Sequence, residues 1–277
     1  MKTGLRIVLV FALVWCLSRS AVYLLPGDPV EFLVHESLVQ ISPETLRAKM
    51  DLNAPLMSRI FSLPKNQSLI RAEPASLLLK KSLSRSLILT LITLMFALPL
   101  SFSLLYLHFR GGSRRLWSNR IILFLTALPT LVMGPLILRS LDLPNPILPA
   151  LTLALSMTAF WTRALSTKID ELLPVSSVPG ARALGFPEFK IFVRDLLAPS
   201  LGGFIAYFGT QLGILLNGSL IVETLFQWGG LGSLIVESVL SRDYPVIEMG
   251  IITATLLTLI TQQIGYSLQK YWDPEIQ

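Results

Sequence analysis

The sequence is short of charge, cysteine and histidine, and these shortages exclude several classes of protein. Charged residues make up 14% of the 277 residues, against about 25% in an ordinary soluble domain, whereas apolar residues make up 52%. The single cysteine, Cys16, lies in an apolar run, which excludes an intrachain disulfide and a cysteine-based metal site. The two histidines, His35 and His108, lie far apart and cannot form a metal-binding pair. This composition indicates an integral membrane protein.

The chain also lacks the common catalytic and nucleotide-binding motifs. It contains no Walker A motif, no HExxH and no GxSxG, and its lone serines and acids have no neighbouring base to activate them. We therefore expect no catalytic residue, no cofactor and no bound metal. The net charge of +6 does not indicate nucleic acid, because the basic residues cluster beside apolar runs rather than among aromatic residues.

Apolar runs divide the chain into six predicted spans, at about 20 residues for each crossing. The predicted spans are 7–25, Ser86 to Leu107, Ile121 to Leu141, Ile147 to Leu165, Leu201 to Val222 and Val246 to Leu268. Pro129 and Pro135 predict a kink or a break in the third span. Arg19 lies near the outer end of the first span, where it is expected to reach the membrane surface. The spans otherwise offer only neutral polar groups.

Basic residues beside these runs predict the orientation. Lys2 and Arg6 precede the first run, which could be a signal peptide, but no convincing cleavage site follows and we favour an uncleaved span. His108 and the arginines between 110 and 120 form a cluster without an acid, which predicts a cytoplasmic loop. Both termini are then cytoplasmic. Residues 26–85 form an extracytoplasmic segment, with a short helix expected from Pro43 to Met50.

A polar segment from Thr167 to Ala198 interrupts the apolar runs. A stretch with this many charges cannot lie in hydrocarbon, so it must be a loop outside the bilayer. Pro187 followed by Glu188 is typical of a helix start. Two interpretations stay open. The segment is either a loop helix that rests on the membrane surface or a docking element for a soluble partner.

Two further groups of residues are candidates for function. Gln211, Asn217 and Gln262 lie within predicted spans, where they either form hydrogen bonds between helices or line a polar path. On the outer side, Phe226 and Trp228 precede Gly229, Gly230 and Gly232, and an amphipathic pattern follows as far as Leu240. This pattern predicts a tight turn and then a short amphipathic helix, in a re-entrant hairpin.

Several motifs of the chain resemble those of a known family. The residues that carry the resemblance are Pro26-Gly27-Asp28-Pro29, Ala181-Arg182-Ala183 with Gly185, GSLIVETLFQWGGLGSLIVESVLSRDYPVIEMG over residues 218–250, and Trp272-Asp273-Pro274. They are similar to motifs of the inner-membrane permease subunits of bacterial ABC importers for di- and oligopeptides and for nickel. Leu184 stands where that family usually has lysine.

The resemblance implies an all-α membrane protein with six transmembrane helices, of the type I ABC importer permease fold. Residues 1–25 would be the first transmembrane helix, 26–85 the extracytoplasmic segment, and 86–277 the core with the cytoplasmic coupling loop 167–198. The protein would be a non-enzymatic permease subunit in the bacterial inner membrane, in contact with membrane lipid. Its implied partners are a second homologous permease, two ABC ATPase subunits and an extracytoplasmic substrate-binding protein.

The resemblance also implies the transported substrate and the residues that couple the chain to an ATPase. Peptides are the favoured substrate, with nickel or another solute as the alternative, and a secondary transporter is a second alternative. Residues expected to couple the chain to an ATPase are Ala181, Arg182, Ala183, Gly185, Phe186 and Phe189. Arg182 is expected to bond to the partner, and the two phenylalanines are expected to anchor it. Gly185 is expected either to let two backbones approach or to turn the chain at positive φ.

Overall fold

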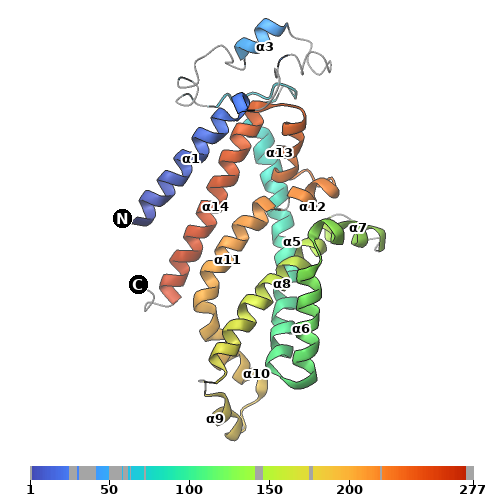
Figure 1. Cartoon of the computed structure of the whole chain (residues 1–277), viewed down its shortest axis with the longest axis vertical. Helices are drawn as coiled ribbons and strands as arrows, with labels where there is room; N and C mark the ends of the chain where they lie inside the picture. Colours follow the sequence, from blue (N-terminus) through green and yellow to red (C-terminus); the bar gives the residue numbers. More distant parts are fainter. Residues whose placement is uncertain are drawn as a thin grey trace. The chain divides into compact units, whose positions relative to one another are not determined.

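The computed structural model describes residues 2–24, 30, 42–49, 58, 62, 64–71, 73–140, 146–174, 177–218 and 220–272, and this part of the chain is helical, without a strand (Figure 1). The elements are α1 (Lys2–Leu24), α3 (Pro43–Lys49), α5 (Ala75–Phe109), α6 (Gly112–Ala127), α7 (Thr130–Ser140), α8 (Ile147–Leu172), α9 (Val178–Ala183), α10 (Glu188–Ile191), a π-helix (Phe192–Leu197), α11 (Ala198–Gly218), α12 (Leu220–Leu225), α13 (Leu231–Leu240) and α14 (Tyr244–Trp272). The motif at residues 26–29 and the Asp-Pro pair at 273–274 lie outside the described residues.

Four of the described helices are long and apolar enough to cross a membrane. They are α5, α8, α14 and the stretch that includes α10, the π-helix and α11, and the bent pair α6 and α7 makes five if it counts as one span. The remaining predicted span is α1, whose described apolar stretch, Val8–Ser20, is shorter than these. Helix α3 occupies the place predicted for the short helix after residue 42.

The third predicted span is broken, as its prolines indicate. Helices α6 and α7 are bent by 100° at the break. Leu128 ends α6 in extended backbone, at φ −87° and ψ 113°, and Pro129 follows. This is the conformation that a residue before proline prefers, because the proline ring disfavours a helical predecessor. Pro135 lies inside α7.

Most of the basic cluster, predicted to be a loop, is helical. Helix α5 ends at Phe109 and α6 begins at Gly112, so Arg114, Arg115 and Arg120 belong to α6. Gly111 and Gly112 have positive φ, of +71° and +54°, which allows the chain to reverse within a few residues. The start of α5 was also misplaced, because its helix begins at Ala75 rather than near residue 86.

The chain divides into two compact units, each with its own core. The first comprises residues 1–87 and 216–259, and the second 88–215 and 260–277. In the first unit, Ala75, Leu79, Leu231, Leu234 and Val246 form a buried cluster that joins α5, α13 and α14. The second unit has a larger cluster, described below, around the ends of α5 and α8.

Small residues allow α11 and α14 to cross closely within the second unit. A Cβ atom placed on Gly209 would lie 2.7 Å from the Cα atom of Gly265, nearer than real Cβ atoms come to backbone. Glycines at a crossing let two helix backbones approach, which is how membrane helices gain packing energy without a hydrophobic drive. The small residues of the fifth predicted span therefore serve close packing at this crossing.

The prediction that Arg19 reaches the membrane surface is wrong. Arg19 is 3% exposed and forms an ion pair with Glu248, which is also 3% exposed and lies one turn inside α14. Its second terminal nitrogen donates to the Ser62 hydroxyl. A buried charge costs much free energy unless it is paired, and the partner here lies 229 residues away in the sequence. The spans therefore contain ionisable groups as well as neutral polar ones.

Candidate functional site

Within the polar segment, α9 and α10 are two short helices joined by a glycine turn. Helix α9 ends in a Schellman motif, because the N–H of Phe186 donates to the carbonyl of Ala181 at 3.1 Å and that of Gly185 donates to Arg182 at 3.0 Å. Gly185 has φ +75°, and nothing lies within 4 Å of a Cβ atom placed on it. Within the chain, the glycine is therefore required by its backbone conformation rather than by crowding.

The next helix is seated on a buried aromatic and aliphatic cluster. Phe192, in the π-helix, is fully buried, and its ring centroid lies 5.4 to 5.5 Å from the rings of Phe102, Tyr106 and Phe109 on α5. Other members of the cluster come from α5, α8, α9, α10 and the π-helix: Leu105, Leu165, Ile169, Val178, Ala181, Ile191 and Leu196. The ends of α5 and α8 therefore hold this segment as a formed element (Figure 1).

Arg182 was expected to bond to a partner, but its guanidinium is engaged within the chain. Its Nε and a terminal nitrogen donate to the two carboxylate oxygens of Glu188, at 2.9 and 3.0 Å. The same guanidinium carbon lies 5.3 Å from the ring centroid of Phe109. A two-pronged ion pair and a cation–π contact fix the arginine in place. Arg182 therefore joins α9 to α10 and to the end of α5.

The two phenylalanines predicted as anchors are also partly used by the chain. Phe186 is half-buried, with the Lys190 ammonium 4.9 Å and the Arg194 guanidinium 5.2 Å from its ring centroid. Phe189 is 54% exposed, and its ring meets those of Phe102 and Tyr106 edge-on, at 5.9 and 5.8 Å. Phe186 is thus covered by cations, whereas Phe189 keeps an open face.

The remaining residues of the segment divide between support and surface. Ala181 is buried and Ala183 is exposed. Leu184, directly before the glycine turn, is 77% exposed, more than either phenylalanine. From the sequence, Leu184 stands out only as a departure from a family pattern. Its place at the tip of a fixed turn could have been found by asking what the residue before a positive-φ glycine presents to solvent.

A polar network that was not predicted from the sequence ties α5, α6 and α8 together. The buried His108 ring lies 3.0 Å from Asn119 Oδ1 and 3.1 Å from Asp170 Oδ1, and Arg115 donates to the other Asp170 oxygen at 2.8 Å. The network joins the last turns of α5 and α8 to the first half of α6. Its members come from three helices, so no local sequence motif predicts it.

The glycine-rich turn between α12 and α13 is organised around a fully buried acid. The carboxylate of Glu223, from α12, accepts the N–H groups of Gly232 at 2.9 Å and Ser233 at 3.2 Å, in the first turn of α13. Its other oxygen accepts the hydroxyl of Ser86 at 2.6 Å. Ser86 in turn accepts the N–H of Leu231 at 2.8 Å. The first turn of α13 thus receives its caps from α12 and α5.

All five residues predicted for the outer turn lie in this one structure. A Cβ atom on Gly230 would lie 2.4 Å from the Glu223 carboxylate, and one on Gly232 would lie 2.6 Å from Leu220 Cα. Gly229 has φ +72°. Trp228 donates its indole N–H to the carbonyl of Arg85 at 3.0 Å, and Phe226 is buried. The turn and the short helix after it are present as predicted, but most of these side chains are committed to the fold.

The three polar residues predicted to line a path belong to both units, Asn217 to the first and Gln211 and Gln262 to the second. Asn217 donates to the carbonyl of Ala254 on α14 at 2.9 Å, within the first unit, which is the interhelical role considered above. In the second unit, Gln211 donates to the Tyr207 hydroxyl on its own helix at 2.7 Å, and Gln262 is half-buried. Among the described residues, no group of three or more His, Cys, Asp or Glu could hold a metal ion.

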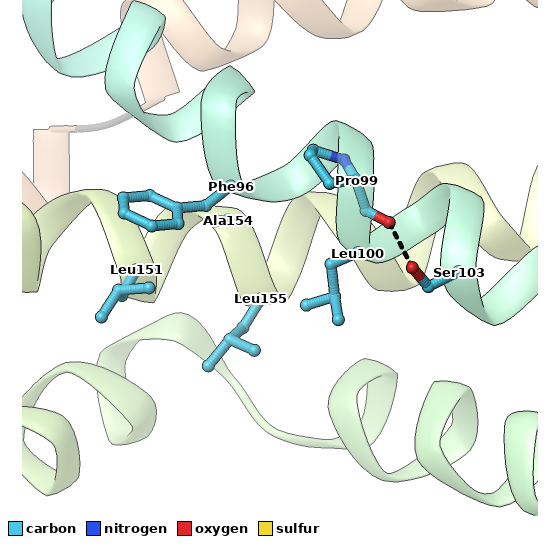
Figure 2. A pocket seen from close by; sticks show the side chains of 7 residues that line it. All are labelled: Phe96, Pro99, Leu100, Ser103, Leu151, Ala154 and Leu155. Carbon is cyan, nitrogen blue, oxygen red and sulfur yellow. Dashed lines mark hydrogen bonds between the residues drawn. The ribbon is translucent and has the colours of Figure 1, made fainter.

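Two cavities of the second unit flank the middle of α5, and Pro99 lines both. The first, of about 340 Å³, lies between α5 and α8, and Figure 2 shows its side chains: Phe96, Pro99, Leu100, Ser103, Leu151, Ala154 and Leu155. Its one hydroxyl, on Ser103, donates to the Pro99 carbonyl at 2.8 Å. The second, of about 450 Å³, is lined mainly by apolar residues that include Phe102, Trp161 and Phe204. Neither cavity is lined by a charged side chain.

Comparison with known proteins accounts for this set of features. Residues 97–277 match the family described as the binding-protein-dependent transport system inner membrane component. The chain belongs to this family of transport proteins. Members of the family are multi-span permease subunits of ABC importers, so the chain is an ABC importer permease. The two short helices seated on α5 and α8 lie within the matched part.

Individual relatives extend the likeness to most of the chain. Nickel import system permease proteins of Staphylococcus aureus are similar to it, at 27% identity for strain USA300 and 28% for strain MRSA252, over 98% of this chain and 89% of theirs. Two solved structures share the fold at 16% identity. An amino acid ABC transporter crystallised with histidines covers 71% of this permease with a TM-score of 0.59, and the MetNI methionine transporter, in an inward-facing form, covers 72% with 0.60. The match covers 94% of the amino acid transporter chain and 97% of the methionine transporter chain. The permease is therefore an all-α membrane protein of the ABC importer fold.

Proposed function

We propose that this permease forms half of the translocation path of an ATP-driven importer in a bacterial cytoplasmic membrane. Its partners would be a second homologous permease, two ABC ATPase subunits beneath the membrane and a substrate-binding protein outside. We further propose six spans, with α1 as the first and both termini in the cytoplasm. The observation that carries the proposal is the polar segment, which is a formed pair of short helices fixed to the bundle by Phe192 and its neighbours.

The packing of the polar segment suits it to transmit force. From Glu188 onwards α10, the π-helix and α11 follow one another without a break as far as Gly218. A displacement of α10 by an ATPase would therefore move α11 as well. The buried cluster also links α10 to the ends of α5 and α8, so three long helices would respond together. A packed cluster resists deformation, which makes such a movement a rigid one.

Within the segment, we assign different roles to the predicted coupling residues. Ala181, Arg182, Gly185 and Phe186 set the shape of the turn through the contacts described above. Ala183, Leu184 and Phe189 are exposed and would enter a groove on the ATPase. Apolar and aromatic residues in fully desolvated positions dominate interface energies, so Leu184 and Phe189 should contribute most.

For the substrate, we propose di- or oligopeptides, with nickel as the alternative because the staphylococcal relatives carry that name. The support for peptides is chemical. A bare nickel ion on its path would be expected to meet imidazole, carboxylate or sulfur ligands, and the described residues gather no such group. Of the three polar residues first considered, Gln211 and Gln262 remain candidates for the path, whereas the amide of Asn217 is bonded to α14.

Reconstitution in liposomes tests the proposal against a secondary transporter. The chain alone and the chain with its ATPases, second permease and binding protein would be compared for uptake of labelled dipeptides and of nickel-63. We expect uptake only with the complete set, and only with ATP inside the compartment that holds the ATPases. Uptake by the chain alone, driven by an ion or solute gradient, would show that it is a secondary transporter.

A further inference from the structure

The exposed face of α6 carries arginines that have no acid partner among the described residues. From Ala75 to Ser140 the sequence contains no Asp or Glu. Arg115 is paired with Asp170 from α8. Arg114 and Arg120 are exposed, and in the described part of the chain no carboxylate lies within ion-pair distance of either one. The start of α6 therefore has positive charge that is available to an outside partner.

The same face carries exposed apolar residues next to these arginines. Trp117 is 61% exposed and Leu116 is 60% exposed. The Arg120 guanidinium carbon lies 5.7 Å from the Trp117 ring centroid, so the charge and the indole form one surface. Tryptophan and arginine beside each other are typical of the boundary between lipid headgroups and hydrocarbon, where an amphipathic ring and a long cation are both accommodated.

The order of residues along α6 indicates which way this surface faces. Arg114, Trp117, Ile121 and Phe124 lie three or four positions apart, on one side of the helix, and change from charged to apolar along it. From Arg114 to Phe124 the helix rises about 15 Å, enough to pass from headgroups into hydrocarbon. The neighbouring side of the helix is fixed to the bundle, because Ser118, Ile122 and Leu125 are buried and the Ser118 hydroxyl donates to the Leu104 carbonyl at 2.8 Å.

We propose that this face of α6, defined by Arg114, Trp117 and Arg120, binds the headgroups of anionic phospholipids. The two arginines would hold the phosphate groups, and Trp117 would lie at the base of the headgroup layer. The occupant is argued from charge: a surface with two unneutralised cations, followed by an apolar helix face, is complementary to anionic lipid. A zwitterionic lipid carries no net charge for these arginines to attract.

The position of the surface gives the lipid a structural consequence. Helix α6 is joined to α5 by the turn at Gly111 and Gly112, and α5 ends at Phe109, the ring under Arg182. Lipid bound at Arg114 would therefore fix the depth in the membrane of the hairpin on which the polar segment is seated. The binding itself does not depend on the proposed coupling function, and it can be measured without an ATPase.

Native mass spectrometry of the full chain in neutral detergent tests this proposal. The chain would be titrated with phosphatidylglycerol and with phosphatidylcholine of the same acyl chains. We expect tighter binding of phosphatidylglycerol, and a loss of about fivefold in affinity for each arginine removed, or about 25-fold for Arg114→Gln with Arg120→Gln. Raising NaCl from 0.05 to 0.5 M should weaken binding of phosphatidylglycerol by the wild-type chain, because surface charges are screened.

The control has the same change in net charge elsewhere on the second unit. Lys168→Gln with Arg194→Gln removes two cations that are paired with Glu171 and Asp195, and it should leave the affinity unchanged. Arg114→Lys with Arg120→Lys should keep most of the binding. Equal affinity for both lipids, an equal loss in the control, or no loss in the glutamine variant would overturn the proposal. So would unchanged lipid binding together with lost ATPase co-purification, which would assign the surface to a protein partner.

Discussion

The Glu223 carboxylate accepts the backbone N–H of Gly232 at 2.9 Å, so an acid from one helix caps the first turn of the next. In a membrane protein, this acid supplies acceptors that water cannot supply. The first N–H groups of a helix lack partners within the helix, and water is scarce where α13 begins among buried residues. A carboxylate also complements the partial positive charge at a helix N-terminus. The outer turn is thereby held closed.

We expect Glu223→Ala to destabilise the protein by about 3 kcal/mol, because it leaves the N–H groups of Gly232 and Ser233 and the Ser86 hydroxyl without their acceptor. The measurement is the unfolding midpoint of the purified chain in detergent. Glu237→Ala is the matched control, since that acid is 55% exposed and pairs with Arg71 at the surface, where an ion pair contributes under about 1 kcal/mol. Similar losses in both variants would contradict the capping role.

A second prediction concerns Gly185, which has positive φ and, among the described residues, nothing within 4 Å of a Cβ atom placed on it. Gly185→Val should strain the backbone by about 1–2 kcal/mol and distort the turn that presents Leu184. Gly185→Asn should be tolerated, because asparagine adopts this conformation more readily. The readouts are co-purification of the ATPases and uptake in cells at equal expression.

The matched control for this prediction is Gly180→Ala. Gly180 lies within α9 with open space around it and without positive φ. The alanine should be neutral or slightly stabilising, because alanine has the higher helix propensity. If Gly185→Val keeps both ATPase and uptake, then the turn is not part of the coupling surface. If Gly180→Ala fails as well, then close approach of the partner, rather than φ, limits this helix.

A third prediction tests the buried pair between α1 and α14. Arg19→Met should cost about 3–5 kcal/mol, because Glu248 would remain buried without its cation. Arg19→Met with Glu248→Met should recover most of that loss, since two apolar side chains replace two desolvated charges. Arg71→Met, at the exposed pair with Glu237, should have little effect. Additive losses for the two buried substitutions, measured by thermal unfolding, would contradict the pairing.

The local pattern of the sequence predicted the positions of helices better than the contacts between side chains of different helices. The final span was predicted over residues 246–268 and is part of Tyr244–Trp272, and the break at Pro129 follows from the restricted backbone before proline. By contrast, the partners of Arg19 and Ser86 lie 229 and 137 residues away, respectively. No periodicity carries such information. It depends on which helices become neighbours, which a single sequence read locally does not specify.

The glycine turn of the polar segment follows from local sequence, whereas its side-chain contacts do not, for the same reason. Gly185 was recognised because positive φ is a property of one residue and its turn. The two-pronged pair between Arg182 and Glu188 was missed because it depends on how α9 folds back on α10. Glu188 had been interpreted only as an acid at a helix start. A side chain assigned to an absent partner was thus already held within the chain.

The last prediction separates these two roles of Arg182. If the arginine acts by joining α9 to α10, then Arg182→Glu should break the pair, place two acids together and uncouple ATP hydrolysis from transport. Exchanging both charges, as Arg182→Glu with Glu188→Arg, should restore part of the coupling. The rescue should be partial, because the cation–π contact with Phe109, of about 0.5–1 kcal/mol, is lost. If Arg182 instead bonds to an ATPase, then the exchange should stay uncoupled although the protein is stable. ATPase co-purification and uptake, measured for the single variants and the exchange at equal expression, decide between the two roles.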